Sequence, residues 1–386
     1  MMMERRTFYL PPRIIVKREG FERLGEEAAR LGRKALLVTG RNFARRTGLL
    51  RRAVDLLSKA GVEAVVFDRV EPEPSVETVE DGRALARREG CDLVIGLGGG
   101  SALDVGKAVA GLLPLPGTVR EYLYGREIEG PGVPFVAVPT TAGTGAEVTN
   151  NSVLIDRERM VKKSIRSPHW VAKVAIVDPL LTLTAPPKVT ASAGMDALSH
   201  AVEGLVSVAA TPVTDALALH ATRLIYRNLP RAFKEPGDVE ARERVALGSH
   251  IAAMGFANSG LGAVHGLAHP VGVVAGAPHG VVCGLLLPVV MEFNLQVAKH
   301  KYAKLAQVMG LCSFPETNPE EAAKLAIEAI RRLLAELGLP RRLRELGLER
   351  AQLKEIAENT PSSGSLRFNP RPASPEDLLS ILEAAF

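Results

Sequence analysis

The chain has 386 residues, of which 46% are hydrophobic and 24% charged; this composition is typical of a soluble protein with a substantial core and two or three domains. The formal net charge of +5 is small against 48 basic and 43 acidic residues, and no dense basic block stands out. We therefore expect neither nucleic-acid binding nor a membrane-surface partner. Three scattered cysteines do not form a disulfide framework, so a reduced, cytoplasmic location is expected.

The N-terminus shows no apolar segment of a signal peptide, and no uncharged apolar run approaches about 18 residues. We therefore expect no membrane-spanning helix. Over the first 185 residues, short apolar runs alternate with helix-period stretches. The runs predict strands at residues 34–39, 62–67, 92–97, 134–138 and 174–177, with helices at 20–31, 49–60 and 77–89. Such alternation is typical of a parallel sheet covered by helices on both faces.

From residue 189 onward the pattern is almost entirely helical, rich in Ala, Leu, Glu and Arg. We place the boundary within residues 183–190. The expected domains are residues 1–185, an α/β domain, and residues 186–386, a helical domain. A loop over residues 360–373 precedes a last helix, which Ser374 is expected to cap, with Pro375 at its first position.

Two loops follow predicted strands at the edge where open parallel sheets bind ligands. The first is Gly98-Gly99-Gly100-Ser101, which runs into the helical pattern 102–113, and the second is the glycine- and threonine-rich segment 139–145. Glycines let the backbone approach a pyrophosphate, and a helix N-terminus offers unpaired N–H groups. A single glycine triplet is as often a tight turn, but two such loops in one sheet favour a nucleotide site.

Histidines cluster in the helical half. Asp196 and His200 are four residues apart in the helical stretch 191–205 and share one face. His265 and His269 have the same spacing, and His279 follows Pro278 at a loop or helix start. One carboxylate with two or three imidazoles suits Zn(II) or Fe(II) better than Mg(II) or Ca(II). Each histidine alone is more simply a core or capping residue, whereas the cluster favours a metal site.

These segments, in this order, resemble the iron-containing (group III) alcohol dehydrogenase family across essentially the whole chain. The matching motifs are the glycine segment from Gly98 to Asp104 and Lys107, the threonine segment 139–147, residues 194–203, residues 265–280 and the late Asn369-Pro370-Arg371.

The resemblance implies an N-terminal α/β dinucleotide-binding domain with a Rossmann-like parallel sheet, an all-α C-terminal metal-binding domain and a cleft between them. It implies that the metal is held by Asp196, His200, His265 and His279, and that His269 lies near without ligating. It places the cofactor on Gly98, Gly99, Gly100, Ser101, Asp104, Thr140, Thr141, Thr144, Lys162 and Leu181, and the substrate near Asn151 and Phe256. Adjacent Lys163 leaves the register of Lys162 open by one. Family members are commonly dimers or larger.

Departures from the family pattern are Ala146 for Ser, Ala193 for Thr, Glu73 for Asn, and Cys283-Gly284 for Asn-Ala, none of them at the four metal positions. A further departure concerns cofactor choice. In the family, an acidic residue commonly follows a Val-Thr pair at a strand end and selects NAD. Here Gly40 stands in its place, and Arg41 follows. Because a guanidinium suits a phosphate, we expect NADP(H) to be favoured over NAD(H).

The expected function is hydride transfer between NAD(P)(H) and a small aliphatic alcohol or diol, with Fe²⁺, or alternatively Zn²⁺, as Lewis acid. His269 is the candidate proton relay; the alternative is that it packs against a ligand or orients it. Four protein ligands would close a tetrahedral site, so catalysis would need five-coordination. A dehydroquinate-synthase-like or glycerol-dehydrogenase-like enzyme is the alternative within this architecture. A non-catalytic nucleotide-binding module, or a metal-free enzyme resembling maleylacetate reductases, would have no use for the metal positions.

Overall fold

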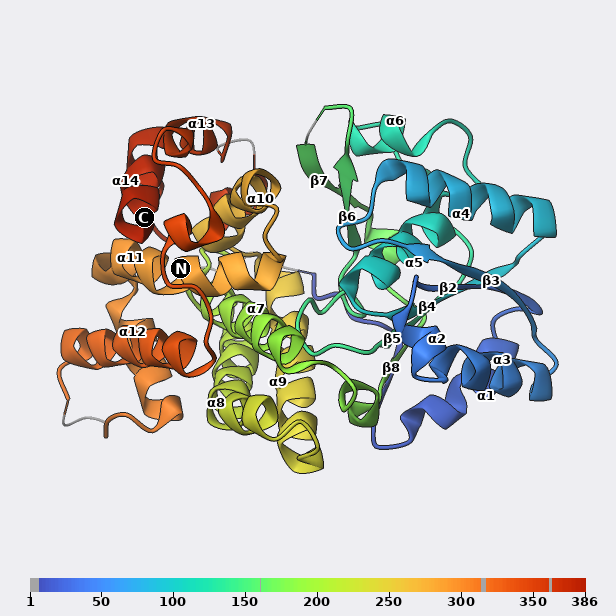
Figure 1. Cartoon of the computed structure of the whole chain (residues 1–386), viewed down its shortest axis with the longest axis horizontal. Helices are drawn as coiled ribbons and strands as arrows, with labels where there is room; N and C mark the ends of the chain where they lie inside the picture. The colour runs from blue at the N-terminus through green and yellow to red at the C-terminus, as the bar shows by residue number, and fades with distance from the viewer. Residues whose placement is uncertain (1–6, 160, 314–316, 361–362) are drawn as a thin grey trace. The chain divides into compact units, whose positions relative to one another are not determined.

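The computed structural model describes residues 7–159, 161–313, 317–360 and 363–386. The chain divides into two compact units. The first comprises the chain up to Thr141 together with Gly145–Thr184 and carries the strands; the second comprises Ala142–Thr144 and Ala185–Phe386 and is helical (Figure 1). The expected α/β and all-α halves are therefore present. Residues 142–144 of the threonine loop belong to the helical unit. The expected division, with one boundary after residue 185, places them in the α/β domain instead.

The first unit is built on a six-stranded sheet in which every pairing is parallel. The strand order is β1-β8-β5-β4-β2-β3. Five strands match the predicted ones: β2 (Lys34–Gly40), β3 (Glu63–Val70), β4 (Leu93–Gly98), β5 (Phe135–Pro139) and β8 (Val174–Val177). The edge strand β1 (Arg13–Val16) is not predicted by the sequence because it has four residues and no fully buried side chain.

Side chains of successive strand residues enter two separate cores, one on each face of the sheet. Leu36 and Val38 of β2 pack in a core with α4 (Val76–Glu89) and α5 (Gly100–Leu112). Leu37 packs in the other core, with α1 (Leu24–Ala29) and α3 (Leu49–Lys59). Helices thus cover both faces, as predicted. The helix expected over residues 20–31 is divided into a 3₁₀ turn, η1 (Gly20–Arg23), followed by α1.

The strand order places a topological switch point between β2 and β4. From β2 the chain crosses to β3 on one side, and from β4 it crosses to β5 on the other side. The two crossover connections diverge there and leave a crevice at the carboxyl ends of β2 and β4. Gly40 ends β2 and Gly98 ends β4. The sheet therefore brings the segments that carry the expected cofactor residues to its ligand-binding edge.

Shorter elements complete this unit. A two-stranded antiparallel hairpin, β6 (Asn151–Asp156) with β7 (Val161–Arg166), lies outside the main sheet and is absent from the sequence prediction. Its second strand, VKKSIR, is largely polar and gives only a weak strand signal. The other short elements are α2 (Phe43–Arg46), α6 (Val119–Leu123), η2 (Pro168–Trp170) and η3 (Pro179–Thr182).

The second unit packs its helices around one large core, with α7, α8 and α9 side by side (Figure 1). Ser374 caps the last helix through a capping box with Asp377, and Pro375 takes its first position, as predicted. The helices are α7 (Pro187–Val206), α8 (Pro212–Lys234), α9 (Val239–Ser259), α10 (Ala263–Ala275), α11 (His279–Met309), α12 (Pro319–Glu336), α13 (Gln352–Asn359) and α14 (Pro375–Ala385), with 3₁₀ turns η4 (Leu343–Leu346) and η6 (Leu366–Phe368).

Within the described residues, helix α11 is the one helix long and apolar enough to cross a membrane by length and composition. Of its most apolar 18-residue window, 61% is buried inside the protein. The helix packs against α7, α8, α10, α12 and α14. Its apolar character therefore belongs to the core of the helical unit.

Candidate metal centre and nucleotide loops

Three helices of the second unit supply the side chains of the predicted metal centre. On α7, Asp196, His200 and Glu203 occupy positions i, i+4 and i+7 and so share one face. His265 lies in the first turn of α10, and His279 is the first residue of α11, directly after Pro278. The side chain of His279 is 20% exposed, whereas those of Asp196 and His265 are each 3% exposed.

The carboxylate of Asp196 is the meeting point of three imidazoles. Its Oδ1 lies 3.8 Å from Nε2 of His200, 3.5 Å from Nε2 of His265 and 3.8 Å from Nε2 of His279. These separations exceed the ~2.9 Å of a good hydrogen bond, and this buried Oδ1 has no hydrogen-bond partner among the described residues. They are close to the ~3.4 Å that separates ligand atoms bound at about 2.1 Å around one tetrahedral ion. Asp196, His265 and His279 therefore fit a single divalent metal ion. His200 faces the same carboxylate oxygen, and its role as a ligand stays a prediction.

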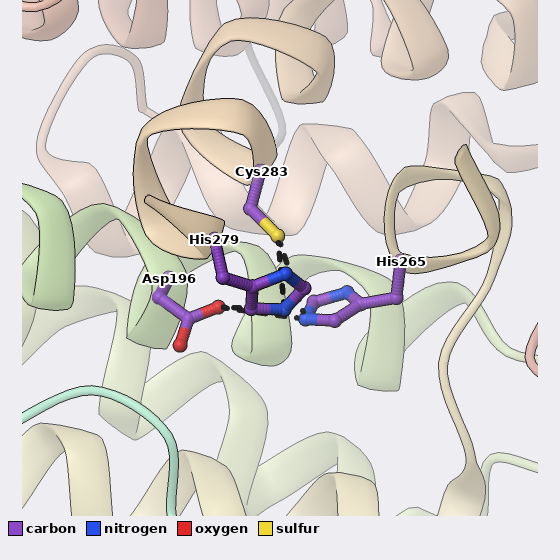
Figure 2. Close-up of side chains that lie close together, drawn as sticks. All are labelled: Asp196, His265, His279 and Cys283. Carbon is purple, nitrogen blue, oxygen red and sulfur yellow. Dashed lines mark hydrogen bonds and ion pairs between the residues drawn. The ribbon is translucent and has the colours of Figure 1, made fainter. Parts of the chain in front are cut away.

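The structure adds a fifth side chain, which the sequence does not predict at this centre. Cys283 lies one turn after His279 on α11, with its Sγ 3.5 Å from Nε2 of His279 and 3.8 Å from Nε2 of His265 (Figure 2). The potential ligand atoms of Asp196, His265, His279 and Cys283 all lie within 4.8 Å of one another. The i,i+4 spacing from His279 is the sequence signal that identifies it.

Glu203 also contacts the centre through a ligand. Its Oε2 lies 2.5 Å from Nδ1 of His265, and its Oε1 accepts a hydrogen bond of 2.7 Å from the backbone N–H of Val264. A proton shared at Nδ1 leaves the lone pair of Nε2 directed at the centre. The resemblance gives Glu203 no role, although its spacing of seven residues from Asp196 puts it on the same helix face.

Burial and charge act against each other on the ionisable groups of the centre. Burial by itself raises the pKa of Asp196, but His200, His265 and His279 outweigh it and hold that pKa far below its usual range. Burial lowers the pKa of His265, whereas Cys283 and Glu203 beside it raise the pKa well above 6.5 in the net result. Burial raises the pKa of the Cys283 thiol to about 11. The centre thus keeps an anionic carboxylate among the imidazoles.

Two further predicted residues lie beside these ligands. His269, one turn after His265, is half-buried, and its ring centroid lies 5.4 Å from that of His279. Neither His269 nor the predicted ligand His200 belongs to the group whose donor atoms all lie within 4.8 Å of one another. The ring of Phe256 stacks on His200, with centroids 4.1 Å apart and planes 18° apart. Phe256 therefore forms an apolar wall against one ligand, and its contact with substrate stays a prediction.

In the first unit, the glycine and threonine loops meet at the carboxyl edge of the sheet. Gly99 precedes α5, whose first turn contains Gly100 and Ser101. The backbone N–H of Thr140 donates a hydrogen bond of 2.9 Å to the carbonyl of Gly98, and a Cβ at Gly99 would lie 3.4 Å from Oγ1 of Thr141. The free N–H groups at the start of α5 thus adjoin the threonine hydroxyls, an arrangement suited to phosphate. Thr144 belongs to the other unit.

Asp104 and Lys107, one turn apart on α5, are tied to the hairpin and the segment before it. Nζ of the buried Lys107 donates to the carbonyl of Ala146 at 2.7 Å, to the carbonyl and Oγ1 of Thr149 at 2.7 and 2.9 Å, and to the carbonyl of Asn151 at 2.9 Å. Asp104 accepts a hydrogen bond of 3.2 Å from the N–H of Val153. Burial raises the pKa of Asp104 to about 6 and lowers that of Lys107 to about 8. Here these two motif residues hold the scaffold together.

The other predicted cofactor residues lie around the same edge. Arg41, just after Gly40, donates from Nε to the carbonyl of Arg69 at 3.2 Å. Lys162 forms an ion pair with Glu73, the residue that stands where the resemblance has Asn. Leu181 is 4% exposed and packs in the core with α1 and α3. Asn151, which is predicted to lie near the substrate and not the cofactor, donates from its side-chain amide to Oγ of Ser164 at 3.4 Å.

The first unit is a doubly wound parallel sheet with a loop suited to binding phosphate. The second unit is helical and holds a carboxylate and imidazoles close together. These features define a metal- and nucleotide-dependent enzyme. Two family models match the chain: "Iron-containing alcohol dehydrogenase" over residues 11–179 and "Fe-containing alcohol dehydrogenase family, C-terminal" over residues 190–386. The chain is 40% identical over 381 residues to 1,3-propanediol dehydrogenase of Klebsiella pneumoniae, covering 98% of this chain and 97% of that protein.

It is 34% identical over 379 residues to NAD-dependent methanol dehydrogenase of Bacillus methanolicus, covering 98% of this chain and 99% of that protein. A crystal structure of 1,3-propanediol oxidoreductase superposes with a TM-score of 0.96 at 39% identity, over 99% of this chain and 100% of the other. The chain belongs to the iron-containing alcohol dehydrogenase family. It is accordingly an alcohol/aldehyde oxidoreductase, with a metal cofactor and a nicotinamide nucleotide.

Proposed function

We propose that this enzyme interconverts small aliphatic alcohols or diols and their aldehydes, with Asp196, His200, His265 and His279 holding Fe²⁺, or alternatively Zn²⁺, and with NADP(H) as the favoured cofactor. The observation that carries the metal assignment is the buried Oδ1 of Asp196, which faces three Nε2 atoms at 3.5–3.8 Å with no hydrogen bond. A carboxylate buried in this way costs free energy unless a cation completes the site.

A divalent ion at this centre supplies Lewis acidity to an alcohol or carbonyl oxygen, and the nicotinamide supplies or accepts the hydride. The protein contributes the arrangement. Asp196 neutralises part of the cation's charge, Glu203 fixes the ring of His265, and Phe256 shields His200 from water on one side. His269 holds or releases a proton at a ring nitrogen. The centroid of its ring lies 5.4 Å from that of the ligand His279.

The chemistry of the helices that carry the metal centre supports a short, uncharged alcohol as the substrate. The named activities of the two relatives, on 1,3-propanediol and methanol, also concern short alcohols. A dehydroquinate-synthase-like substrate, with a phosphate and a carboxylate, would need several basic side chains. Helix α10 has no Lys or Arg, and α7 has only Lys188, in its first turn.

The preference for NADP(H) is supported by the end of strand β2. No side chain stands at Gly40, and the terminal amino groups of exposed Arg41 make no hydrogen bond with the described residues. Neighbouring Arg45 is engaged with Asp68. An arginine fork next to an empty position suits the 2′-phosphate of NADP(H) better than the free ribose hydroxyls of NAD(H).

We further propose that the chain acts in the cytoplasm as a homodimer or larger homo-oligomer. Support for the location comes from the cysteines, which are all free thiols. Support for assembly comes from the sheet edge at β1, where Val16 is 40% exposed, and from the preceding Phe8 and Tyr9, 41% and 44% exposed. Light scattering coupled to size-exclusion chromatography measures the assembly directly, and a monomer at micromolar concentration would contradict it.

The metal assignment is tested by His265→Ala and His279→Ala, with exposed His220→Ala on α8 as the matched control. Both site variants should lose bound metal and aldehyde-dependent oxidation of NADPH but keep the helical circular dichroism spectrum, because the helices pack around a large apolar core. The control should keep both. A full equivalent of metal in both site variants, measured by elemental analysis, would overturn the assignment.

A further inference from the structure

The thiol of Cys283 faces the metal centre. Cys283 is 0% exposed, and its Sγ lies within hydrogen-bonding distance of the Nε2 atoms of His265 and His279. In Figure 2 the sulfur points from α11 toward the two imidazole rings, while Asp196 approaches from α7. The cysteine thus stands with the predicted ligands, one helical turn after His279.

The distances from the sulfur of Cys283 to the two imidazole nitrogens match those between two ligand atoms bound to one metal ion. When sulfur binds an ion at ~2.3 Å and imidazole nitrogen at about 2.1 Å, the two donors lie about 3.1–3.8 Å apart at the angles of roughly 90–120° found around a five-coordinate ion. The observed separations of Sγ from the two Nε2 atoms are 3.5 and 3.8 Å. An independent sign of a cation at this place is Oδ1 of Asp196, buried and without a hydrogen-bond partner among the described residues.

We propose that in the substrate-free enzyme Cys283 is a fifth donor of the metal centre, and that its sulfur raises the preference of the centre for Zn²⁺ over Fe²⁺ relative to an oxygen or amide side chain there. This inference rests on the proposed metal site. The metal–sulfur bond replaces the S–H bond, and the proton leaves to water. Thiolate is a soft ligand and favours zinc, whereas the carboxylate and imidazoles accept either ion. Because a catalytic metal needs an open position, Cys283 would have to leave the ion before substrate could bind there.

Cobalt is the probe, since Co²⁺ accepts the same donors and reports them by colour. Metal-free protein titrated with Co²⁺ should show visible d–d bands and, in addition, a near-ultraviolet sulfur-to-cobalt charge-transfer band. Cys283→Ser and Cys283→Ala should lose the charge-transfer band and keep the d–d bands. Cys312→Ser, outside the centre, and Cys91→Ser, in the other unit, are matched controls and should keep both.

Metal choice is measured separately by anaerobic competition between equal concentrations of Zn²⁺ and Fe²⁺ for the metal-free protein. Cys283→Asn should lower the bound Zn:Fe ratio by about tenfold, the scale on which changes around a metal centre alter affinity. The ratio should not change in Cys312→Ser. Elemental analysis provides this readout without reference to activity.

The outcomes separate this inference from the metal site on which it rests. If the unmutated protein binds Co²⁺ with d–d bands but no charge-transfer band, the sulfur is not a donor, while the carboxylate–imidazole site stands. Persistence of the charge-transfer band in Cys283→Ser has the same consequence. If the unmutated protein binds no cobalt, the metal site itself is wrong and this inference is wrong with it. An unchanged Zn:Fe ratio in Cys283→Asn overturns the claim on metal choice.

Discussion

Glu203 links a metal ligand to the helix that carries it. With Oε2 2.5 Å from Nδ1 of His265 and Oε1 accepting from the N–H of Val264 at 2.7 Å, one carboxylate fixes both the ring and the N-terminus of α10. Asn369 adds a second contact there, accepting from the N–H of Ala263 at 3.2 Å. Two of the free N–H groups that begin a helix are therefore bonded to side chains outside it. The position of His265 does not depend on packing alone.

Replacing Glu203 with Gln should weaken metal binding by about 10–100-fold, because the charge that polarises His265 is removed. The amide oxygen of Gln can still accept from Val264, so the start of α10 should keep this contact. The metal-free protein should lose only the stability that the charge of Glu203 gives to protonated His265. Competition with a chromophoric chelator measures the metal affinity. An unchanged affinity would show that the carboxylate is not needed to orient the imidazole.

Metal retention should fall on acidification at pH values above the ordinary histidine range. The pKa of His265 is raised well above 6.5, and a protonated Nε2 cannot bind an ion. In the metal-free protein the sign is opposite. Stability from protonated His265 is fully present below the unfolded value of about 6.5 and is lost as pH rises through the raised pKa. Chelator competition and melting curves across this pH window, with and without metal, should therefore show opposite trends. Parallel trends would contradict the raised pKa.

The fold was predictable where local sequence determines it. Strands such as β4 are fully buried on both faces, so LVIGLG reads as a continuous apolar run bounded by turn residues. Strands β1 and β7 depend on partners far along the chain or on a hairpin, and their half-exposed, mixed sequences carry little signal alone. The cap of α14 was predictable because Ser374 and Pro375 act within one turn.

For the metal centre, sequence spacing identified pairs of potential ligands on one helix face. It did not show that the pairs lie close to one another in the fold. Asp196 and His200 share a helix face by their i,i+4 spacing, but no local rule brings His265 and His279 to them from two other helices. That expectation came from the family resemblance. Cys283 was missed because a cysteine in an apolar helix is normally a core residue. Its role emerges only when α7, α10 and α11 are packed together.

Lys107→Met should destabilise the α/β unit by more than about 3 kcal/mol. The substitution leaves several buried oxygen acceptors without their ammonium donor, and each unsatisfied group costs about 1–3 kcal/mol. The single tryptophan, Trp170, is buried in this unit, so its fluorescence follows urea unfolding there. Exposed Lys59→Met, at the end of α3, is the control and should leave the midpoint almost unchanged. Equal midpoints for the two variants would contradict the structural role of Lys107.

His269→Ala should keep its metal and lose rate by roughly 10²–10⁴-fold, the range typical of a general acid or base, with an altered pH profile. The ring centroid of His269 lies 5.4 Å from that of His279. Because the proposed ligands are Asp196, His200, His265 and His279, coordination should survive its removal. Elemental analysis and pH–rate profiles measure the two effects separately. Loss of metal would make His269 a ligand, and an unchanged rate and profile would remove its relay role.

Gly40→Asp should shift cofactor preference toward NAD(H) on the order of tenfold in kcat/KM, about 1.4 kcal/mol. A carboxylate there can bond the adenosine ribose hydroxyls and repels a 2′-phosphate. The position has room for it, because a Cβ at Gly40 would meet only the carbonyl of Val70, at 3.8 Å. Arg41→Ala should weaken use of NADP(H) and leave use of NAD(H) nearly unchanged, whereas exposed Arg46→Ala, the matched control, should change neither. Steady-state kinetics with both cofactors decide the matter: a strong preference for NAD(H) in the unmutated enzyme would show that Arg41 points to solvent and that an acid at position 40 is not needed to bind NAD(H).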